Sequence, residues 1–391
     1  MTKGAILDAG SREELLRFAA DLVRIQSYSG REEKAVRFIA GRMADLGFDE
    51  VKLDGFGNVL GRIGRGGKSI LFDSHVDTVE VKDEGEWTHP PFGGEIAEGS
   101  LWGRGSVDMK SSAAASIYAA ALAKRAGLAE GTTIYVSCTV FEEDCDGENL
   151  RHLFGETGIR PDACVICEPS NNLIALGHKG KAQILVRTRG VSAHGSAPEK
   201  GVNAIYEMAE IIRRVERVNL ELARRERPRG SLVMSRISST SASLNAVPSE
   251  CEVYLDRRMV VGETEETIKR EMDAIVAGKN AAWEIGALQR TTWTGLDLRY
   301  EPFHLAWELD PGHRLSRLLI EAYEETFGSR PEKYDYWDFS TNAVATVREG
   351  IPTIGFGAGD HKQAHMRDEH CTVDQIVDAC GMYVNVMRRF G

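Results

Sequence analysis

The sequence has no long, uninterrupted hydrophobic run. Its longest stretch of small apolar residues, 113–123, is broken by Ser116 and Tyr118 and is too short and too rich in alanine to cross a membrane. The first residues lack the apolar core and the small-residue cleavage site of a secretory signal peptide. The chain is therefore expected to be a soluble cytoplasmic protein.

Cysteine is scarce, and basic residues are not in excess. The seven cysteines are odd in number and scattered through the chain, which argues against a disulfide framework. With 48 Lys and Arg against 59 Asp and Glu, the net charge is −11. This balance argues against nucleic acid or an anionic membrane as a partner, although acidic side chains gathered around cations would contribute to it.

Several catalytic signatures are also absent. There is no GxSxG elbow to present a nucleophilic serine, and Ser74 is merely the neighbour of His75 at a predicted strand end. No P-loop and no dinucleotide-binding fingerprint follows the first predicted strand, and no internal repeat is present. The chemistry must therefore come from another set of residues.

Hydrophobic periodicity predicts an α/β protein. Residues 11–25, which open with a Ser11 capping box, and residues 32–46 and 111–126 have helical spacing, whereas 69–72, 133–141 and 163–167 are short apolar runs typical of buried strands. Strands that alternate with helices predict a mostly parallel sheet flanked by helices.

The pattern changes in the middle of the chain. Two helices (203–222 and 264–277) and several half-exposed strands predict a smaller α+β domain, after which α/β character returns with 314–327, 353–356 and 373–389. We therefore expect a catalytic domain formed by residues 1–180 and 297–391, interrupted by an inserted domain at 181–296.

Acidic and histidine residues occur where predicted strands end. Ligands of parallel α/β sheets bind beyond the carboxyl ends of the strands, so these side chains are expected along one edge. In chain order they are His75, Asp77, Asp108, Glu142, Glu143, Glu168 and, after a glycine-rich loop, His365.

Such a cluster of carboxylates is tolerable only with cations among them, because desolvated anions repel strongly. A mixed histidine and carboxylate set suits Zn²⁺, with Co²⁺ or Mn²⁺ as alternatives. Two ions about 3.5–4 Å apart would activate a bridging water and polarise a carbonyl group. Each ion then needs its own imidazole and carboxylate, and one carboxylate is shared.

The order of these motifs resembles the family of acetylornithine deacetylase, succinyl-diaminopimelate desuccinylase, aminoacylase and glutamate carboxypeptidase. Within that family, the sequence looks closest to a subgroup of hydrolases linked to selenium metabolism. The resemblance spans nearly the whole chain and rests on residues 74–79 (SHVDTV), 103–110 (GRGSVDMK), 142–143 (EE), 167–169 (CEP), 193–198 (AHGSAP) and 365–369 (HMRDE).

The resemblance implies a role for each residue of the cluster. His75 and Glu168 resemble ligands of one metal, Glu143 and His365 resemble ligands of the other, and Asp108 resembles the bridging ligand. Asp77 is implied to orient the His75 imidazole. Glu142 is implied to be the general base that deprotonates the metal-bridging water and later protonates the leaving amine.

The inserted domain is implied to be a lid that forms a homodimer with its twin. His194 resembles a histidine that reaches a neighbouring active site and stabilises the oxyanion. Asn245 and Arg258 resemble substrate-contacting positions, where an arginine suits a substrate carboxylate. Strand alternation lets only one of Arg257 and Arg258 face the site, and the sequence leaves open which one.

Other positions keep two interpretations. His361 is the chief rival of His365 as a ligand, and His365 is preferred because Asp368 and Glu369 follow it as in the family. Asp144, Cys145 and Asp146 either alter the metal preference or are exposed decoration, which is favoured. The aromatic cluster of Tyr334, Tyr336 and Trp337 could shape the pocket or pack in the core, and Ser340, Thr341 and Asn342 could cap a helix or contact substrate.

The predicted function is metal-dependent hydrolysis of an amide bond in an N-acyl amino acid or short peptide with a free carboxylate. Aminopeptidase or dipeptidase specificity on the same site is one alternative. A catalytically silent binding protein of the same fold is another, although such a protein should have lost ligands or the base, and every expected position is filled here.

Overall fold

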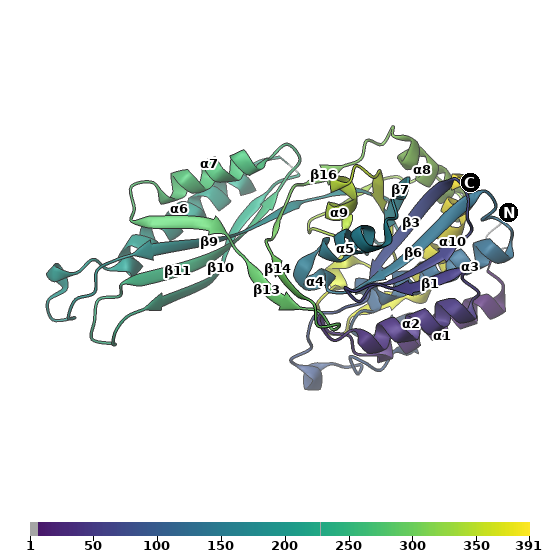
Figure 1. The fold of residues 1–391 in the computed structure, drawn as a ribbon, viewed down its shortest axis with the longest axis horizontal. Coiled ribbons are helices and arrows are strands. Elements are labelled where there is room, and N and C mark those ends of the chain that lie inside the picture. Colours follow the sequence, from purple (N-terminus) through teal and green to yellow (C-terminus); the bar gives the residue numbers. More distant parts are fainter. Residues whose placement is uncertain (1–6, 227) are drawn as a thin grey trace.

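The computed structural model describes residues 7–226 and 228–391. It contains a large body built on a nine-stranded sheet and an elongated smaller body built on a five-stranded sheet. Figure 1 shows the smaller body projecting from one side of the larger one, so that the molecule is long and narrow at one end. No described helix combines the length and the apolar character that crossing a membrane requires.

Parallel strands form the centre of the large sheet. β3 (Lys68–His75) lies between β6 (Thr132–Thr139) and β7 (Ala163–Ile166) and runs parallel to both, and β18 (Thr353–Gly355) runs parallel to β7. Antiparallel pairs extend both edges, which are formed by β1 (Glu50–Leu53), β2 (Val59–Ile63), β8 (Ala175–His178) and β16 (Trp307–Glu308), while β17 (Asp335–Trp337) pairs in parallel with β8.

Helices cover both faces of this sheet because its central strands are apolar on both sides. Ile70 and Phe72 belong to the larger core, whereas Leu71, between them, belongs to the core on the opposite face. The larger core includes α1 (Ala9–Arg24), α2 (Glu33–Asp45), α3 (Ser111–Arg125), α8 (Arg314–Phe327) and α10 (Val373–Phe390). The opposite core includes α5 (Glu148–Thr157) and α9 (Ala343–Arg348). The expected α/β fold class is confirmed.

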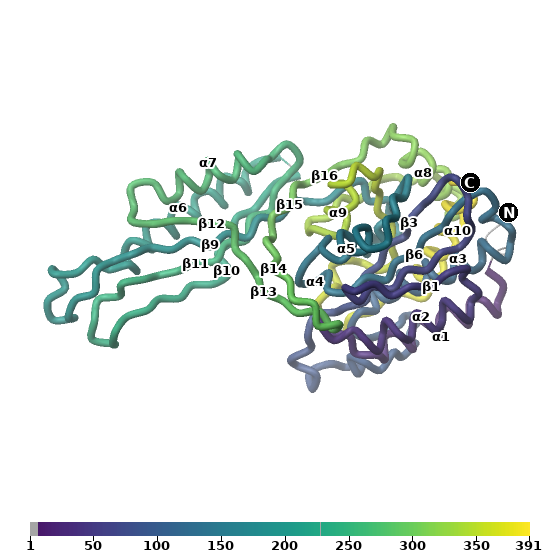
Figure 2. The backbone as a smooth tube through the Cα atoms, viewed as in Figure 1, coloured from purple at the N-terminus to yellow at the C-terminus, as the bar shows by residue number. Residues whose placement is uncertain are grey.

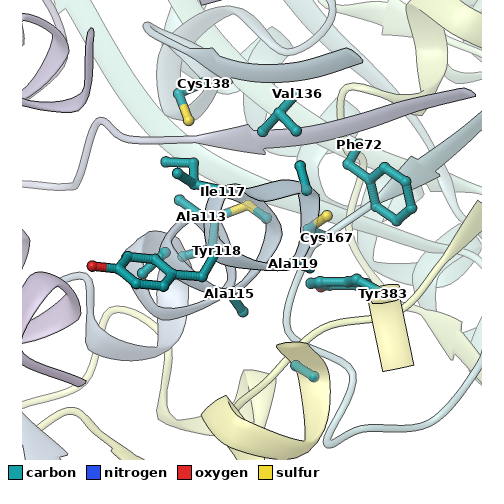
Figure 3. Close-up of a cluster of buried hydrophobic side chains, with 14 of the residues drawn as sticks. Phe72, Ala113, Ala115, Ile117, Tyr118, Ala119, Val136, Cys138, Cys167 and Tyr383 are labelled. Atoms are coloured by element: carbon teal, nitrogen blue, oxygen red, sulfur yellow. The ribbon is translucent and has the colours of Figure 1, made fainter. Parts of the chain in front are cut away.

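Helix α3 is built mainly from small residues and is almost entirely buried. Figure 3 shows its alanines and Ile117 beside Val136 of the sheet, with Phe72 and Tyr383 close by. Alanine side chains let the helix approach the sheet closely, since they add little bulk between the two backbones. The helix therefore packs in one core with the central strands that lead to the candidate site.

The smaller body has its own core. Its sheet has the order β10 (Ser231–Thr240), β11 (Glu250–Met259), β9 (Gly180–Arg189) and β12 (Ala281–Ile285). Two amphipathic helices, α6 (Ala204–Ala223) and α7 (Glu265–Val276), pack their apolar residues against this sheet. Asn203, as expected for a helix start, caps α6 with its side-chain oxygen.

The chain passes between the two bodies through adjacent strands. It leaves by β8 and β9, and it returns through β15 (Phe303–His304), which pairs with β9, and β16, which pairs with β8. A Cβ atom at Gly180 would lie 2.4 Å from the His304 carbonyl oxygen and 2.6 Å from the Ala306 nitrogen, so glycine permits this close approach. Figure 2 shows the two crossings together, and we call them the hinge.

Between β12 and β15, the chain also reaches the large body in a hairpin. It is formed by β13 (Leu288–Thr291) and β14 (Asp297–Tyr300). Its residues Leu298 and Tyr300 belong to the core of the large body. The expected domain boundary at residue 296 falls within this hairpin, which packs on the catalytic side of the hinge.

Candidate metal centre and substrate pocket

The adjacent carboxyl ends of three strands bring the candidate residues together. His75 is the last residue of β3, Glu142 follows β6 and Glu168 follows β7. These strands are neighbours and point the same way. Asp108 comes from an irregular turn before α3, and His365 comes from the loop after β18.

Asp108 lies between two imidazoles. Its Oδ1 is 2.9 Å from His75 Nε2, and its Oδ2 is 3.2 Å from His365 Nε2. His365 Nε2 also lies 3.0 Å from the carboxylate of Glu143. One carboxylate therefore offers an oxygen to each half of the cluster, which is the arrangement that a ligand shared by two ions requires.

The other half of the cluster gathers around His75. Its Nε2 is 3.7 Å from Glu168 Oε1 and 4.0 Å from Glu142 Oε2. Two overlapping sets have ligand atoms within 4.8 Å of one another, namely His75, Asp108 and Glu143, and His75, Glu142 and Glu168. The structure thus brings together all the expected ligands, and Glu142 lies among them.

Asp77 contacts three residues of this cluster. Its backbone oxygen lies 3.1 Å from His75 Nδ1, which leaves Nε2 facing Asp108. Its two carboxylate oxygens accept hydrogen bonds from the backbone N–H groups of Glu142 (3.0 Å) and Glu143 (3.1 Å). Asp77 therefore contacts the His75 ring and fixes the backbone of Glu142 and Glu143, whereas the resemblance assigned it only the imidazole.

Glu32 is a site residue that the sequence analysis missed. Its Oε1 accepts hydrogen bonds from the backbone N–H groups of Gly30 and Phe141. Phe141 has a left-handed backbone (φ +65°), and this turn separates strand β6 from Glu142. Burial, followed by the charge of Asp77, raises the pKa of Glu32 to about 8. A lone glutamate at the start of a predicted helix gave no signal of this role.

Glu369 fixes the turn that carries Asp108. Its Oε1 accepts the backbone N–H groups of Val107 (2.9 Å) and Asp108 (3.1 Å), and its Oε2 pairs with Arg104 at 2.6 Å. Arg104 also donates to the backbone oxygen of His365. The residues after His365 therefore link the two loops on which Asp108 and His365 are carried.

Burial and neighbouring charges shift the pKa values of the residues in this cluster. Burial and the neighbouring Glu168 raise the pKa of Glu142 well above its ordinary value, and burial with Asp108 raises the pKa of Glu143 to about 7. Hydrogen bonds with Asp108 and Glu143 raise the pKa of His365 to about 10. These carboxylates cannot all ionise together unless positive charge lies among them, which divalent ions would supply.

A cavity of about 340 Å³ opens beside the cluster. That volume is within the usual range of small-molecule sites. Its lining includes Glu142, Glu143, Glu168, His365 and, from the smaller body, Lys181 and Arg258.

The structure distinguishes Arg258 from Arg257. Arg258 lines the cavity and pairs with Asp256 at 2.7 Å. Arg257 points to the other face of the strand, where it is fully buried and bonds Glu263 and Glu271. The alternation of the strand thus leaves Arg258 as the arginine that faces the site.

The favoured view of Asp144, Cys145 and Asp146 as exposed decoration is wrong for two of the three. Cys145 and Asp146 are buried, and Asp146 pairs with Lys181 at 2.5 Å. Asp144 is partly exposed and pairs with Arg290 of β13 at 2.8 Å. Asp146 is buried because residues far along the chain cover it.

His361 lines the cavity but lies outside the metal cluster. Its Nδ1 is 3.8 Å from Asp335, and its ring packs against Phe339. His365, by contrast, contacts Asp108 and Glu143 directly. The geometry therefore favours His365 as the ligand.

The aromatic cluster divides between surface and core. Tyr334 is partly exposed, whereas Trp337 is fully buried and donates a hydrogen bond to the backbone oxygen of Pro169, beside Glu168. Ser340 lines the cavity, while Asn342 is buried and bonds Asp73 and Thr139.

His194 and Asn245 lie together, away from the cluster. An isolated bridge joins His194 to Ala246, and the Gly195 N–H donates to the Asn245 backbone oxygen. Both residues are exposed, and they follow the ends of β9 and β10 that lie far from the hinge, which Figure 1 shows pointing away from the large body. Both residues lie in the described part of the chain, and neither lines the cavity that contains Glu142.

Comparison with known proteins places these motifs in a family. The model of peptidase family M20/M25/M40 matches residues 71–389. The chain is 37% identical to YgeY from Escherichia coli over 377 residues, covering 95% of this chain and 93% of that protein. It is 28% identical to a succinyl-diaminopimelate desuccinylase from Cereibacter sphaeroides over 385 residues, covering 95% and 97% of the two chains. An acetylornithine deacetylase from Edwardsiella ictaluri is also 28% identical, with 92% and 91% covered.

Solved structures share the fold. Aminopeptidase PepT from Bacillus cereus has a TM-score of 0.74 at 20% identity, with 97% of this chain and 98% of that chain covered. The metallo-carboxypeptidase Sso-CP2 from Sulfolobus solfataricus has a TM-score of 0.73 at 15% identity, with 98% and 99% covered. Together with the family match over most of the chain, these findings show that the protein belongs to peptidase family M20/M25/M40 and is a metal-dependent hydrolase.

Proposed function

We propose that this enzyme uses two metal ions to cleave the amide bond of an N-acyl amino acid or short peptide that carries a free carboxylate. The observation that carries the proposal is the position of Asp108, whose two oxygens face His75 and His365. The relatives named as a desuccinylase and a deacetylase favour an N-acyl substrate.

The residues of the cluster suit two divalent ions. His75 and Glu168 would hold one ion, Glu143 and His365 the other, and Asp108 both. The mixed set of imidazoles and carboxylates favours Zn²⁺, with Co²⁺ or Mn²⁺ as alternatives. When bound, the ions supply the positive charge that polarises the scissile carbonyl and lowers the pKa of a water molecule.

Glu142 is proposed as the general base. Its Oε2 lies 4.0 Å from His75 Nε2, while its Oε1 is buried without a hydrogen-bond partner among the described residues. Asp77 fixes its backbone, so the side chain is held in place. A buried carboxylate with a raised pKa can take a proton from water and deliver it to the leaving amine.

Arg258 is proposed to bind the substrate carboxylate. It lines the cavity together with the cluster, and its guanidinium can bind both oxygens of a carboxylate. Exchange of its contact with Asp256 for the substrate would keep the charge paired. An aminopeptidase or dipeptidase specificity on the same site is the second candidate, favoured by the structural likeness to PepT.

We propose that residues 181–296 are a lid and that the protein is a homodimer joined through it. The lid exposes large apolar side chains, among them Tyr206, Leu220 and Leu244. We propose that these side chains contribute to the interface between the two protomers. In the dimer, His194 and Asn245 of one protomer would reach the neighbouring active site, where His194 would stabilise the oxyanion. The buried, unpaired cysteines fit the reducing cytoplasm.

A substrate panel tests this function. Purified protein loaded with Zn²⁺, Co²⁺ or Mn²⁺ should hydrolyse some N-acyl amino acids faster than dipeptides, and amidated analogues without the carboxylate should be poor substrates. Metal analysis of the same samples should find two ions per chain. Less than about half an equivalent of metal, with no turnover, would favour a catalytically silent binding protein.

A further inference from the structure

Asp146 joins the catalytic helix to the hinge. It directly follows α4 (Glu142–Cys145), the short helix that carries Glu142 and Glu143, and it is only 3% exposed. Its Oδ1 lies 2.5 Å from Lys181 Nζ and accepts a hydrogen bond from the Tyr300 hydroxyl. His304 Nε2 lies 3.9 Å from the same oxygen and 2.7 Å from the Tyr300 hydroxyl.

These partners come from both crossings of the hinge. Lys181 is the second residue of β9, on the outward crossing, and His304 ends β15, on the return crossing. The two residues face each other in the β9–β15 pairing. One buried carboxylate of the catalytic domain is therefore paired with Lys181 of β9 and lies 3.9 Å from His304 of β15.

The charges make this contact firm. Although burial opposes it, the positive charge of Lys181 lowers the pKa of Asp146 and favours the ionised carboxylate. Burial lowers the pKa of His304, so this ring contributes its hydrogen bond with the Tyr300 hydroxyl rather than a positive charge. A buried ion pair that keeps further hydrogen bonds is costly to break, since each partner would be left as an unpaired buried charge.

The hinge contact also sets the place of the substrate-facing arginine. Lys181 and Arg258 are directly opposite each other in the β9–β11 pairing, so their side chains share one face of the lid sheet. Both line the cavity that contains Glu142. Fixing Lys181 to the end of α4 therefore fixes Arg258 relative to Glu142.

We propose that Asp146 is a positioning residue that sets the orientation of the lid, and with it the distance between the carboxylate-binding Arg258 and the general base Glu142. The inference rests on the proposed function for the role of Arg258. It does not depend on that function for the geometry of the hinge.

The test measures the hinge and the kinetics separately. Spin labels are attached to cysteines introduced at the exposed residues Lys34 of α2 and Lys269 of α7, since all seven native cysteines are buried. In metal-loaded protein, Asp146→Ala should broaden the distance distribution between the two labels. It should also raise KM for a carboxylate substrate about tenfold, with a smaller effect on kcat and with metal content unchanged.

Matched variants isolate the hinge contact. Lys181→Met should reproduce the broadening, and the double variant should be no broader than either single one. Asp144→Ala removes a carboxylate of the same helix whose partner, Arg290, lies on β13, and it should leave the distribution narrow. If Asp146→Ala does not fold, Asp146→Asn and Lys181→Met carry the comparison.

Two results would overturn the proposal. One is a label distribution in the Asp146 and Lys181 variants that superimposes on that of the unmodified chain. The other is loss of metal from Asp146→Ala, which would place the residue in the metal site. Absence of turnover on every substrate would instead refute the proposed function, because the label distances would still report on the hinge.

Discussion

Lys181 and Arg258 face each other across the β9–β11 pairing, and both side chains reach the cavity above the metal cluster. Each is already matched by an acid, Lys181 by the buried Asp146 and Arg258 by the partly exposed Asp256. The Lys181 and Arg258 side chains therefore differ in how deeply their acidic partners are buried. Lys181 is held at the hinge by a buried partner, whereas the partner of Arg258, the residue proposed to bind the substrate carboxylate, is partly exposed.

Replacing Arg258 by alanine should lower kcat/KM for an N-acyl amino acid by about 10- to 100-fold, because a charged hydrogen bond to the carboxylate is lost. The loss should appear mainly in KM and should vanish for an amidated substrate. Arg257→Ala is the matched control. It should lower the stability by about 3–5 kcal/mol, since it leaves Glu263 and Glu271 without their buried partner.

Glu142→Ala should lower kcat by about 10²- to 10⁴-fold, the usual contribution of a general base. Metal content should stay at two ions per chain, measured by elemental analysis. Glu142→Gln, which keeps the shape, should behave alike. Glu143→Ala should instead lose metal, and loss of metal from the Glu142 variants would identify Glu142 as a ligand.

His194→Ala should lower kcat by about 10²- to 10³-fold, as loss of an oxyanion donor does, with both metals retained. Because the residue is proposed to act on the neighbouring site, complementation is the sharper measurement. An equimolar, re-equilibrated mixture of His194→Ala and Glu142→Ala chains should recover about a quarter of normal activity, since random pairing makes half of the dimers mixed and each mixed dimer has one complete site. A mixture no more active than its components would remove His194 from the neighbouring site.

After the metal ions are removed by chelation, the free energy of unfolding should fall as pH rises. The folded chain holds protons on Glu143, whose pKa is raised from 4.5 to about 7, and on His365, whose pKa is raised from 6.5 to about 10. Stability from Glu143 is lost between about pH 4.5 and 7, and stability from His365 is lost between about pH 6.5 and 10.

The melting temperature of EDTA-treated protein should therefore drop through this range. The metal-loaded protein should change less, because metal ions favour the deprotonated ligands. His365→Ala should flatten the alkaline part of the curve for the chelated protein, and an unchanged slope there would contradict this assignment of protons.

The cluster could be predicted from the sequence because its residues stand at recognisable strand ends. The apolar runs before His75, Glu142 and Glu168 predicted β3, β6 and β7, and the parallel order of these strands brings the three residues together. The α/β fold class followed from the same runs. Local patterns carry this information since a buried parallel strand must be apolar on both faces.

Contacts between distant segments could not be predicted in this way. Asp146 is surrounded by acidic neighbours in sequence, and it is buried only because Lys181 and Tyr300 cover it. Glu32 gave no signal, since its partner Phe141 lies 109 residues away. One local prediction also differs from the structure. A capping box was expected at Ser11, but the N-cap of α1 is Asp8, whose side chain accepts a hydrogen bond from the Ser11 N–H.

Neighbouring strands join the smaller body to the larger one, with Gly180 packed closely against the returning chain. A domain whose two chain ends lie close together can be inserted into another domain without disrupting its core. The smaller body can therefore change in sequence while the strands that precede the candidate metal ligands stay intact.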